Sequence, residues 1–93
     1  MLEKEIEKAL VRKTKECGGM AWKFVSPGKS GVPDRIILLP NGKMGFVELK
    51  APGKEMRELQ KKRKKQLEEL GFKVFTVDGT ERIEGVLNEI QTA

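Results

Sequence analysis

The chain has no histidine and only one cysteine among its 93 residues. The absence of histidine excludes Ser-His-Asp and Cys-His catalysis, HExxH zinc sites and histidine general bases. The single cysteine, Cys17, excludes an internal disulfide and is typical of a reducing intracellular compartment. Without histidine or a second cysteine, any bound metal is expected to be a hard ion held by oxygen ligands.

Long apolar segments are also absent. No run approaches the ~18 apolar residues of a membrane-spanning helix, and the charged N-terminus lacks the apolar stretch of a signal peptide. Lys and Arg number 19 against 14 Asp and Glu, which gives a net charge of +5. We therefore expect a soluble, cytoplasmic, basic protein without a membrane partner. A chain of this size builds a single core, so one domain over residues 1–93 is expected.

Hydrophobic periodicity and turn residues predict seven elements in the order α-β-β-β-α-β-α. Helices are expected at residues 2–16, 55–70 and 81–90, and strands at residues 20–25, 34–39, 43–50 and 72–77. The predicted buried stripe of the second helix consists of Met56, Leu59, Leu67 and Leu70. Cys17 ends the first helix on its apolar side and is expected to be a small buried residue.

The turn between the second and third strands determines which residues face each other. Residues 39–42 (Leu-Pro-Asn-Gly) fit a three-residue loop, a type I turn closed by Gly42 in the left-handed region. In that register Asp34 lies opposite Glu48, and Lys50 follows on the same face. A two-residue turn would shift the pairing by one, separate the two acids and mix the apolar residues between faces. The three-residue loop is therefore favoured.

Two carboxylates placed side by side repel each other unless a positive group lies between them. A hard divalent cation such as Mg²⁺ fits, because it takes one or two carboxylates together with backbone, water and phosphate oxygens. The ammonium group of Lys50 would then stabilise an attacking hydroxide or the charge that develops on phosphorus. A simpler interpretation stays open, in which Asp34 ends a strand and Glu48 pairs with Lys50 at the surface.

Three segments together resemble the VRR-NUC branch of the PD-(D/E)xK nuclease superfamily. They are Gly31-Val32-Pro33-Asp34-Arg35, Phe46-Val47-Glu48-Leu49-Lys50-Ala51-Pro52, and Gln60 ten residues after Lys50. The resemblance implies an α/β fold with a restriction-endonuclease-like αβββαβ core, a mixed four-stranded sheet flanked by helices, here followed by a C-terminal helix. It also implies a Mg²⁺- or Mn²⁺-dependent phosphodiesterase acting on DNA without a small-molecule cofactor. Stand-alone members of this branch resemble homodimeric endonucleases that cleave branched DNA such as Holliday junctions.

The resemblance also implies roles for individual residues. Asp34 and Glu48 would be the metal carboxylates, the Leu49 carbonyl a further ligand, Lys50 the catalytic lysine, and Gln60 a side chain that reaches the site from the second helix. The family uses one more acid from the first helix, where Glu7 and Glu3 are both candidates. The spacing of Glu7 to Leu10 and Gly18 resembles that of the superfamily's first helix, which favours Glu7 and leaves Glu3 in reserve.

Basic residues near these motifs predict contacts with DNA phosphates, which give salt-sensitive, sequence-independent affinity. The candidates are Lys23, Lys29, Ser30 and Arg35 around the loop before Asp34, and Lys61, Lys62, Lys64 and Lys65 on the second helix. Successive helical residues step by ~100°, so the run at 61–65 cannot face one groove as a whole. A solvated helix face remains an open interpretation of that run.

Cleavage of two opposed strands calls for two sites, which a two-fold symmetric homodimer supplies. The candidate dimer surfaces are the strand with Trp22 and Phe24 and the last helix with Ile83, Val86, Leu87 and Ile90. Two alternatives stay open. The chain would be a basic nucleic-acid-binding module with structural acids, which binds without turnover and ignores Mg²⁺, or the same nuclease fold acting on flaps or nicked DNA.

Overall fold

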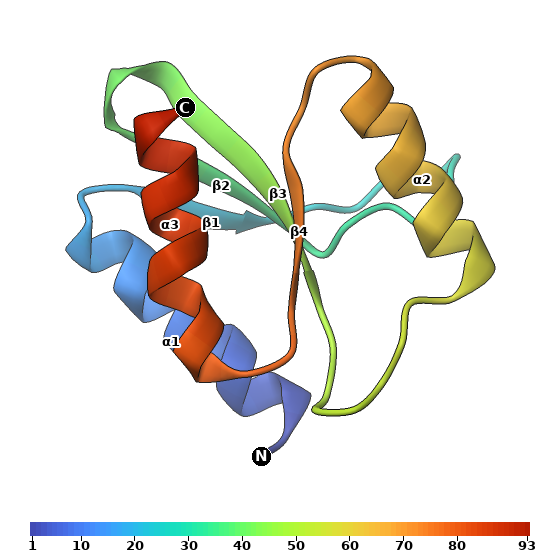
Figure 1. Cartoon of the computed structure of the whole chain (residues 1–93), viewed down its shortest axis with the longest axis horizontal. Coiled ribbons are helices and arrows are strands. Elements are labelled where there is room, and N and C mark those ends of the chain that lie inside the picture. Colours follow the sequence, from blue (N-terminus) through green and yellow to red (C-terminus); the bar gives the residue numbers. More distant parts are fainter.

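Hydrophobic alternation and helical periodicity produce all seven elements in the predicted order. The computed structural model describes residues 1–93 (Figure 1). The helices are α1 (Glu3–Glu16), α2 (Glu58–Glu69) and α3 (Ile83–Thr92), and the strands are β1 (Met20–Lys23), β2 (Arg35–Leu39), β3 (Lys43–Leu49) and β4 (Val74–Val77). Short 3-10 turns lie at Pro40–Gly42 and Thr80–Arg82. The predicted α/β fold with a mixed four-stranded sheet is confirmed.

The sheet has the strand order β1-β2-β3-β4. β1, β2 and β3 pair antiparallel, whereas β4 runs parallel to β3. A parallel neighbour requires a crossover connection, and the segment that contains α2 supplies it. β3 therefore has a partner on each side, and its last five residues are all buried. Any side chain at the end of this strand is enclosed by neighbouring strands.

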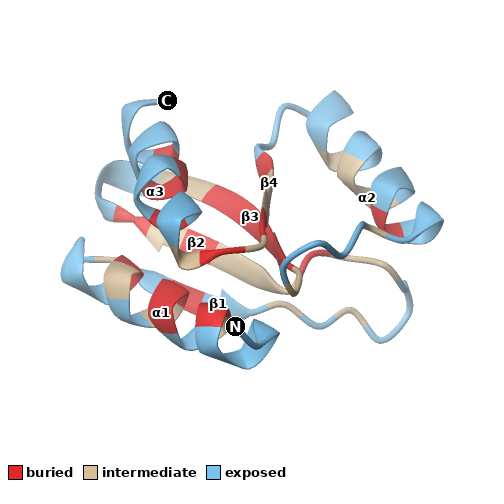
Figure 2. Cartoon of the chain, turned by 60° about the horizontal axis from the view of Figure 1, so that its bottom comes forward, coloured by how far each residue is buried: buried red, intermediate tan, exposed pale blue.

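The core lies between one face of the sheet and the pair α1 and α3 (Figure 2). The most buried aliphatic residues are Ile6 and Leu10 of α1, Ile37, Val47, Leu49 and Val77 of the sheet, and Ile83, Val86, Leu87 and Ile90 of α3. Each such side chain stabilises the fold by about 1.5–3 kcal/mol when it leaves water. The apolar face of the last helix is thus used inside the chain, so the prediction that it forms a dimer surface was wrong. None of the three helices combines the length and hydropathy needed to cross a bilayer.

The opposite face of the sheet is only partly covered. Alternation along the strands places Met20, Trp22, Ile36, Leu38 and Met44 on this face. Trp22 remains 55% exposed, and Met20 is exposed beside it. α2 lies on the far side of β4 from α1 and α3 (Figure 1), so it leaves the β1 side of this face open. We call these five residues the open sheet face.

Three details of the helices differ from the sequence expectation. α2 begins at Glu58, and its predicted buried stripe is wrong: Leu70 is 75% exposed, Leu59 is exposed, and the buried residue is Gln60. The reason is that α2 packs beside the edge strand β4 rather than on the core. Cys17 is exposed, since α1 ends beyond the edge of the core.

The strands are shorter at their free ends than expected, since β1 stops at Lys23 and β4 starts only at Val74. The β2–β3 register is confirmed by the pairing of Leu39 with Lys43. The turn type is different, because both Asn41 (φ 67°) and Gly42 (φ 72°) are left-handed, whereas the predicted loop needs only its closing residue, Gly42, in that region. Asparagine tolerates this region better than most residues, which permits the observed conformation.

Candidate active site

The β2–β3 register places two acids next to each other at one end of the sheet. Arg35 pairs with Val47, so the next positions outward, Asp34 and Glu48, lie opposite each other. Val47 and Leu49 point into the core, and Glu48 between them points to the other face. Glu48 is nevertheless only 1% exposed. A carboxyl group is therefore enclosed beside a second one.

The surroundings of Glu48 favour its neutral form. Burial, a side-chain hydrogen bond with Asp34 and the charge of Asp34 raise the pKa of Glu48 from 4.5 to about 8, against the opposing effect of the nearby Lys50 charge. Its Oε2 atom is buried and has no hydrogen-bond partner. Buried polar atoms are rarely left without a partner, and such an exception calls for a functional explanation.

Asp34 is held in place by the neighbouring strand. Its Oδ2 atom accepts a hydrogen bond from the backbone N–H of Leu49 at 2.7 Å. The segment after β3 closes over the same end of the sheet, because Thr76, the β4 partner of Glu48, donates its hydroxyl to Met56 Sδ at 3.3 Å. Asp34 is thus fixed by β3, and the segment with Met56 is tied to β4 beside Glu48.

The two first-helix acids have different partners. Glu7 Oε2 accepts a hydrogen bond from Arg35 Nε at 2.9 Å, and Arg35 Nη1 donates to the Ala21 carbonyl at 2.8 Å. Arg35 therefore ties α1 to β1 and β2. Glu3, one helical turn earlier, is the acid of α1 whose charge helps to raise the pKa of Glu48. The structure brings Glu3 into the electrostatic environment of the pair and engages Glu7 elsewhere.

Gln60 lies at the start of α2 and is 6% exposed. Its Oε1 atom accepts a hydrogen bond from the backbone N–H of Arg57 at 2.9 Å, which caps the first turn. Lys50, the last residue of the predicted motif, is half-buried, and its backbone N–H donates to the Val77 carbonyl at 3.0 Å. Lys50 thus lies two residues after Glu48, next to the carboxyl pair. The side-chain oxygen of Gln60 is instead used to cap the first turn of α2.

The donor set fits a hard divalent cation. No group of three or more His, Cys, Asp or Glu side chains is gathered in the structure, and the feature that offers carboxyl oxygens is the pair of Asp34 and Glu48. A cation held by this pair would give the buried Glu48 Oε2 atom a partner. Mg²⁺ commonly binds one or two carboxylates and keeps several waters. The residues present therefore match this class of metal.

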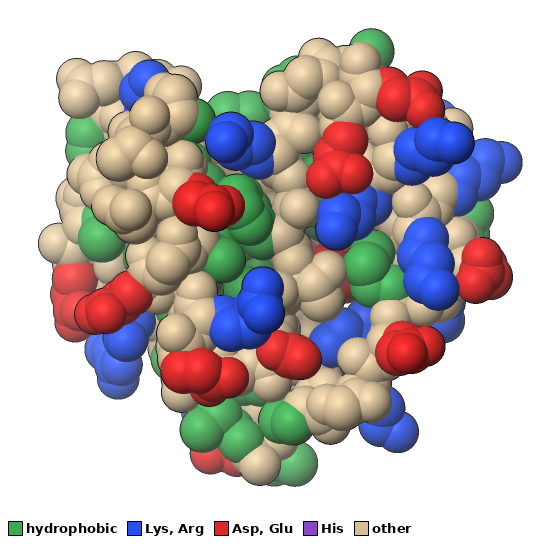
Figure 3. Space-filling model, in the orientation of Figure 1, with side chains coloured by type: hydrophobic (Ala, Val, Ile, Leu, Met, Phe, Trp, Pro, Cys, Tyr) green, Lys and Arg blue, Asp and Glu red, His purple; other side chains and the backbone are tan.

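The predicted phosphate-binding residues lie on two parts of the surface. Lys29 and Ser30 are exposed on the loop before β2, and on α2 Lys61, Lys62 and Lys65 are exposed while Lys64 is half-buried. Figure 3 shows basic side chains gathered over the α2 side, mixed with acidic ones. Arg63, which sequence reasoning left out, donates to the Ser30 carbonyl at 2.8 Å and so joins the loop to α2.

Four cations next to the predicted Lys23 and Arg35 were missed. Lys23 and Arg35 share a surface depression with four cations of α1, which are Lys4, Lys8, Arg12 and Lys15. The spacing of about four residues between these α1 cations places them on one helix face, and this was the signal that would have revealed them. We call the six residues the α1 basic stripe. It begins one residue after Glu3.

Comparisons with known proteins identify the family of the chain. The model of the VRR-NUC domain family matches residues 2–81. A protein of the Acyrthosiphon pisum secondary endosymbiont phage 1 named "Putative nuclease p44" is 50% identical over 76 residues, which is 82% of each chain. A solved structure described as a VRR_NUC domain superposes with a TM-score of 0.86 at 25% identity and covers 92% of this chain and 94% of that chain. The chain therefore belongs to the VRR-NUC family, whose domain is a PD-(D/E)xK-like nuclease.

Proposed function

We propose that the protein is a Mg²⁺- or Mn²⁺-dependent endonuclease that cleaves branched DNA, such as Holliday junctions, as a homodimer. The observation that carries the proposal is the buried carboxyl pair with an unpartnered oxygen on Glu48. A module that only binds nucleic acid has no use for a buried carboxyl group that raises the energy of its own fold. A hydrolytic metal site, in contrast, uses such a carboxyl group to bind its ion.

Asp34, Glu48 and the Leu49 carbonyl would hold the metal, which when bound would neutralise charge on the scissile phosphate. Lys50 would orient the attacking water and stabilise the negative charge that grows on the phosphate oxygens. Displacement of the 3′ oxygen would leave a 5′-phosphate. Gln60 would close the α2 side of the site.

The α1 basic stripe, together with Lys29, Ser30 and the lysines of the 61–65 run, would bind phosphates on either side of the cut. These contacts would supply most of the affinity for DNA without reading its sequence.

Substrate and metal are tested together. Labelled four-way junction, flap, nicked duplex, intact duplex and single strand are incubated with Mg²⁺, Mn²⁺ or EDTA. Cleavage of the junction in either metal, and none in EDTA, is the expected result. If the protein binds all of these substrates but cleaves none in either metal, it is a nucleic-acid-binding module and not a nuclease. Faster cleavage of flaps or nicked duplex than of junctions would show that the protein is a nuclease with a different preferred substrate.

Glu3 is proposed as the acid that α1 contributes to the metal, and Glu7 as a residue that positions α1 through Arg35. Glu3→Gln is expected to weaken metal binding by about 10–100-fold, because it removes a charge next to Glu48. Glu7→Gln is expected to lower the free energy of unfolding by about 1 kcal/mol, because it weakens a partly buried charged hydrogen bond. Calorimetric titration with Mn²⁺ and thermal unfolding measure the two effects. The assignment is reversed if Glu7→Gln weakens metal binding and Glu3→Gln leaves it unchanged.

The open sheet face is proposed as the homodimer interface. Trp22→Glu would place a charge at the centre of this face and is expected to convert a dimer into monomers in sedimentation experiments. Val25→Glu introduces the same charge at an exposed apolar residue beyond the end of β1, and should leave the dimer intact. A wild-type protein that sediments as a monomer while cutting junctions at the full rate would rule out this part of the proposal.

A further inference from the structure

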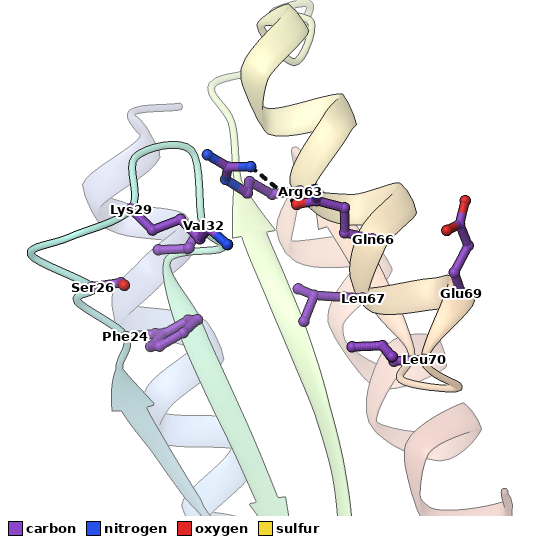
Figure 4. A pocket seen from close by; sticks show the side chains of 9 residues that line it. All are labelled: Phe24, Ser26, Lys29, Val32, Arg63, Gln66, Leu67, Glu69 and Leu70. Atoms are coloured by element: carbon purple, nitrogen blue, oxygen red, sulfur yellow. Dashed lines mark hydrogen bonds between the residues drawn. The ribbon is translucent and has the colours of Figure 1, made fainter.

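A pocket of about 450 Å³ separates the loop that follows β1 from α2 (Figure 4). Its apolar wall consists of Phe24 and Val32 on the loop side and Leu67 and Leu70 on the helix side, and Lys29 and Arg63 also line it. The volume lies within the range of small-ligand sites, about 300–1,000 Å³. Neither the proposed metal ligands nor Lys50 line this pocket.

The loop-side wall is a direct neighbour of the candidate metal site. The Phe24 N–H donates to the Asp34 carbonyl at 2.9 Å, which extends the β1–β2 pairing by one residue. Phe24 therefore lies beside Asp34, and Asp34 lies beside Glu48. Adjacent strands are ~4.8 Å apart, so the aromatic ring begins one strand away from the carboxyl pair. On the opposite wall, Arg63 follows Gln60 by one helical turn.

The pocket is already formed in the free protein. Arg63 joins its two walls, because the guanidinium donates to the Ser30 carbonyl at 2.8 Å and to Gln66 Oε1 at 3.0 Å. Gly31 packs so closely on α2 that an added Cβ would lie 2.7 Å from Leu59 Cγ, and its φ is +83°. The Phe24 ring rests against Phe46 at a centroid distance of 5.6 Å. The loop and the helix thus hold a fixed separation.

The lining matches the parts of a nucleotide. A flat base would stack on an aromatic ring between aliphatic side chains, a contact that strengthens binding of unstacked bases. The two cations would attract the phosphates that flank this base. Figure 4 shows Phe24 and Val32 facing Leu67 and Leu70 across the gap, while Glu69 points away from it. The one acid of the lining therefore does not oppose an anionic strand.

We propose that this pocket receives one unstacked nucleobase of the strand bound at the active site. The proposal rests on the proposed nuclease function and adds a reason for its substrate class. In continuous duplex every base is paired and stacked, so none can enter without loss of those contacts. At a branch point stacking on the neighbouring base pair is interrupted, so a base leaves the helix there at lower cost. The pocket would therefore select DNA in which stacking is interrupted next to the cut.

The test uses a four-way junction with the fluorescent base 2-aminopurine at the branch point, in Ca²⁺ to allow binding. Binding of the wild type is expected to change the fluorescence of this base. Phe24→Leu should remove that change and weaken junction binding about tenfold, with binding of continuous duplex unaffected. Phe72→Leu is the matched control, because Phe72 also packs against Phe46, edge to face at a centroid distance of 5.9 Å, but does not line the pocket. Thermal unfolding of both variants checks that they fold equally.

Equal behaviour of Phe24→Leu and Phe72→Leu would overturn the proposal. The proposal would also be overturned if junction binding by the wild type left the 2-aminopurine fluorescence unchanged while Phe24→Leu lost the dimer. The pocket would then hold a second copy of the chain. Failure of the nuclease function is distinguishable. If the protein gives the fluorescence change but cuts no DNA in Mg²⁺ or Mn²⁺, the base pocket is supported and the proposed nuclease activity is refuted.

Discussion

Replacement of Glu48 by Gln is expected to abolish DNA cleavage and, at the same time, to stabilise the metal-free protein at alkaline pH. Cleavage should fall by about 10³-fold or more, because the substitution removes the charge of a carboxylate that we propose as a metal ligand. The stability effect has the opposite sign. The raised pKa of Glu48, about 8, means that the folded protein holds a proton that the unfolded chain releases near pH 4.5.

The stability contributed by the neutral carboxyl is fully present below pH 4.5 and is lost as the pH rises through about 8. Above pH 8 the wild type must bury an ionised carboxylate, whereas the amide of Gln stays neutral. Thermal unfolding in EDTA from pH 5 to pH 9 should therefore show a falling wild-type curve and a flatter Glu48→Gln curve. Added Mg²⁺ at pH 8–9 should raise the unfolding temperature of the wild type alone.

The matched control is Glu16→Gln, which removes an exposed acid at the end of α1. It should reproduce the wild-type dependence of stability on pH and the wild-type rate of cleavage. If the Glu48→Gln curve instead runs parallel to the wild type across the whole range, then the buried carboxyl does not titrate as the structure indicates.

Lys50→Ala is expected to reduce the single-turnover rate of cleavage by about 10³-fold while changing DNA affinity only a few-fold. The Lys50 side chain is only one of many cations that would attract the DNA strand, but it is the one next to the carboxyl pair. Its removal takes away stabilisation of charge that develops only during the reaction, so the loss should appear in the rate and not in binding. Rates under saturating protein and affinities in Ca²⁺ measure the two quantities separately.

Lys54→Ala provides the comparison for this variant, since Lys54 is an exposed lysine four residues further along the chain. It carries the same loss of charge and should cut at nearly the wild-type rate. Undiminished cleavage by Lys50→Ala would remove the lysine from the mechanism and leave the carboxyl pair as the sole basis of the proposed chemistry.

The juxtaposition of Asp34 and Glu48 could be predicted from sequence because it depends on local rules. A Pro-Asn-Gly turn and the alternation of apolar residues together leave one register that keeps the apolar side chains on common faces. The choice of turn type was not needed for this result. For that reason the register was right although Asn41 adopts a left-handed conformation instead of the type I geometry.

The roles of the first-helix acids depended on contacts that sequence spacing does not contain. Glu3 and Glu7 lie on one helix face, and either satisfies a pattern of acids beside apolar residues. What separates them is Arg35, 28 residues further along the chain, which reaches Glu7. The prediction of the buried residues of α2 was wrong for a related reason. The apolar residues of α2 suit a core-facing helix, but the parallel crossover places α2 beside an edge strand.

The carboxyl pair has a consequence for how the protein would take up its ion. Since Glu48 holds a proton below about pH 8 when no ion is bound, a cation held by the pair would have to release that proton into solvent. Loading and proton release would then be a single exchange, and below that pH a tenfold scarcer ion would require about one unit higher pH for equal occupancy. Acidification would unload the ion and leave a folded, inactive chain in which Glu48 is neutral.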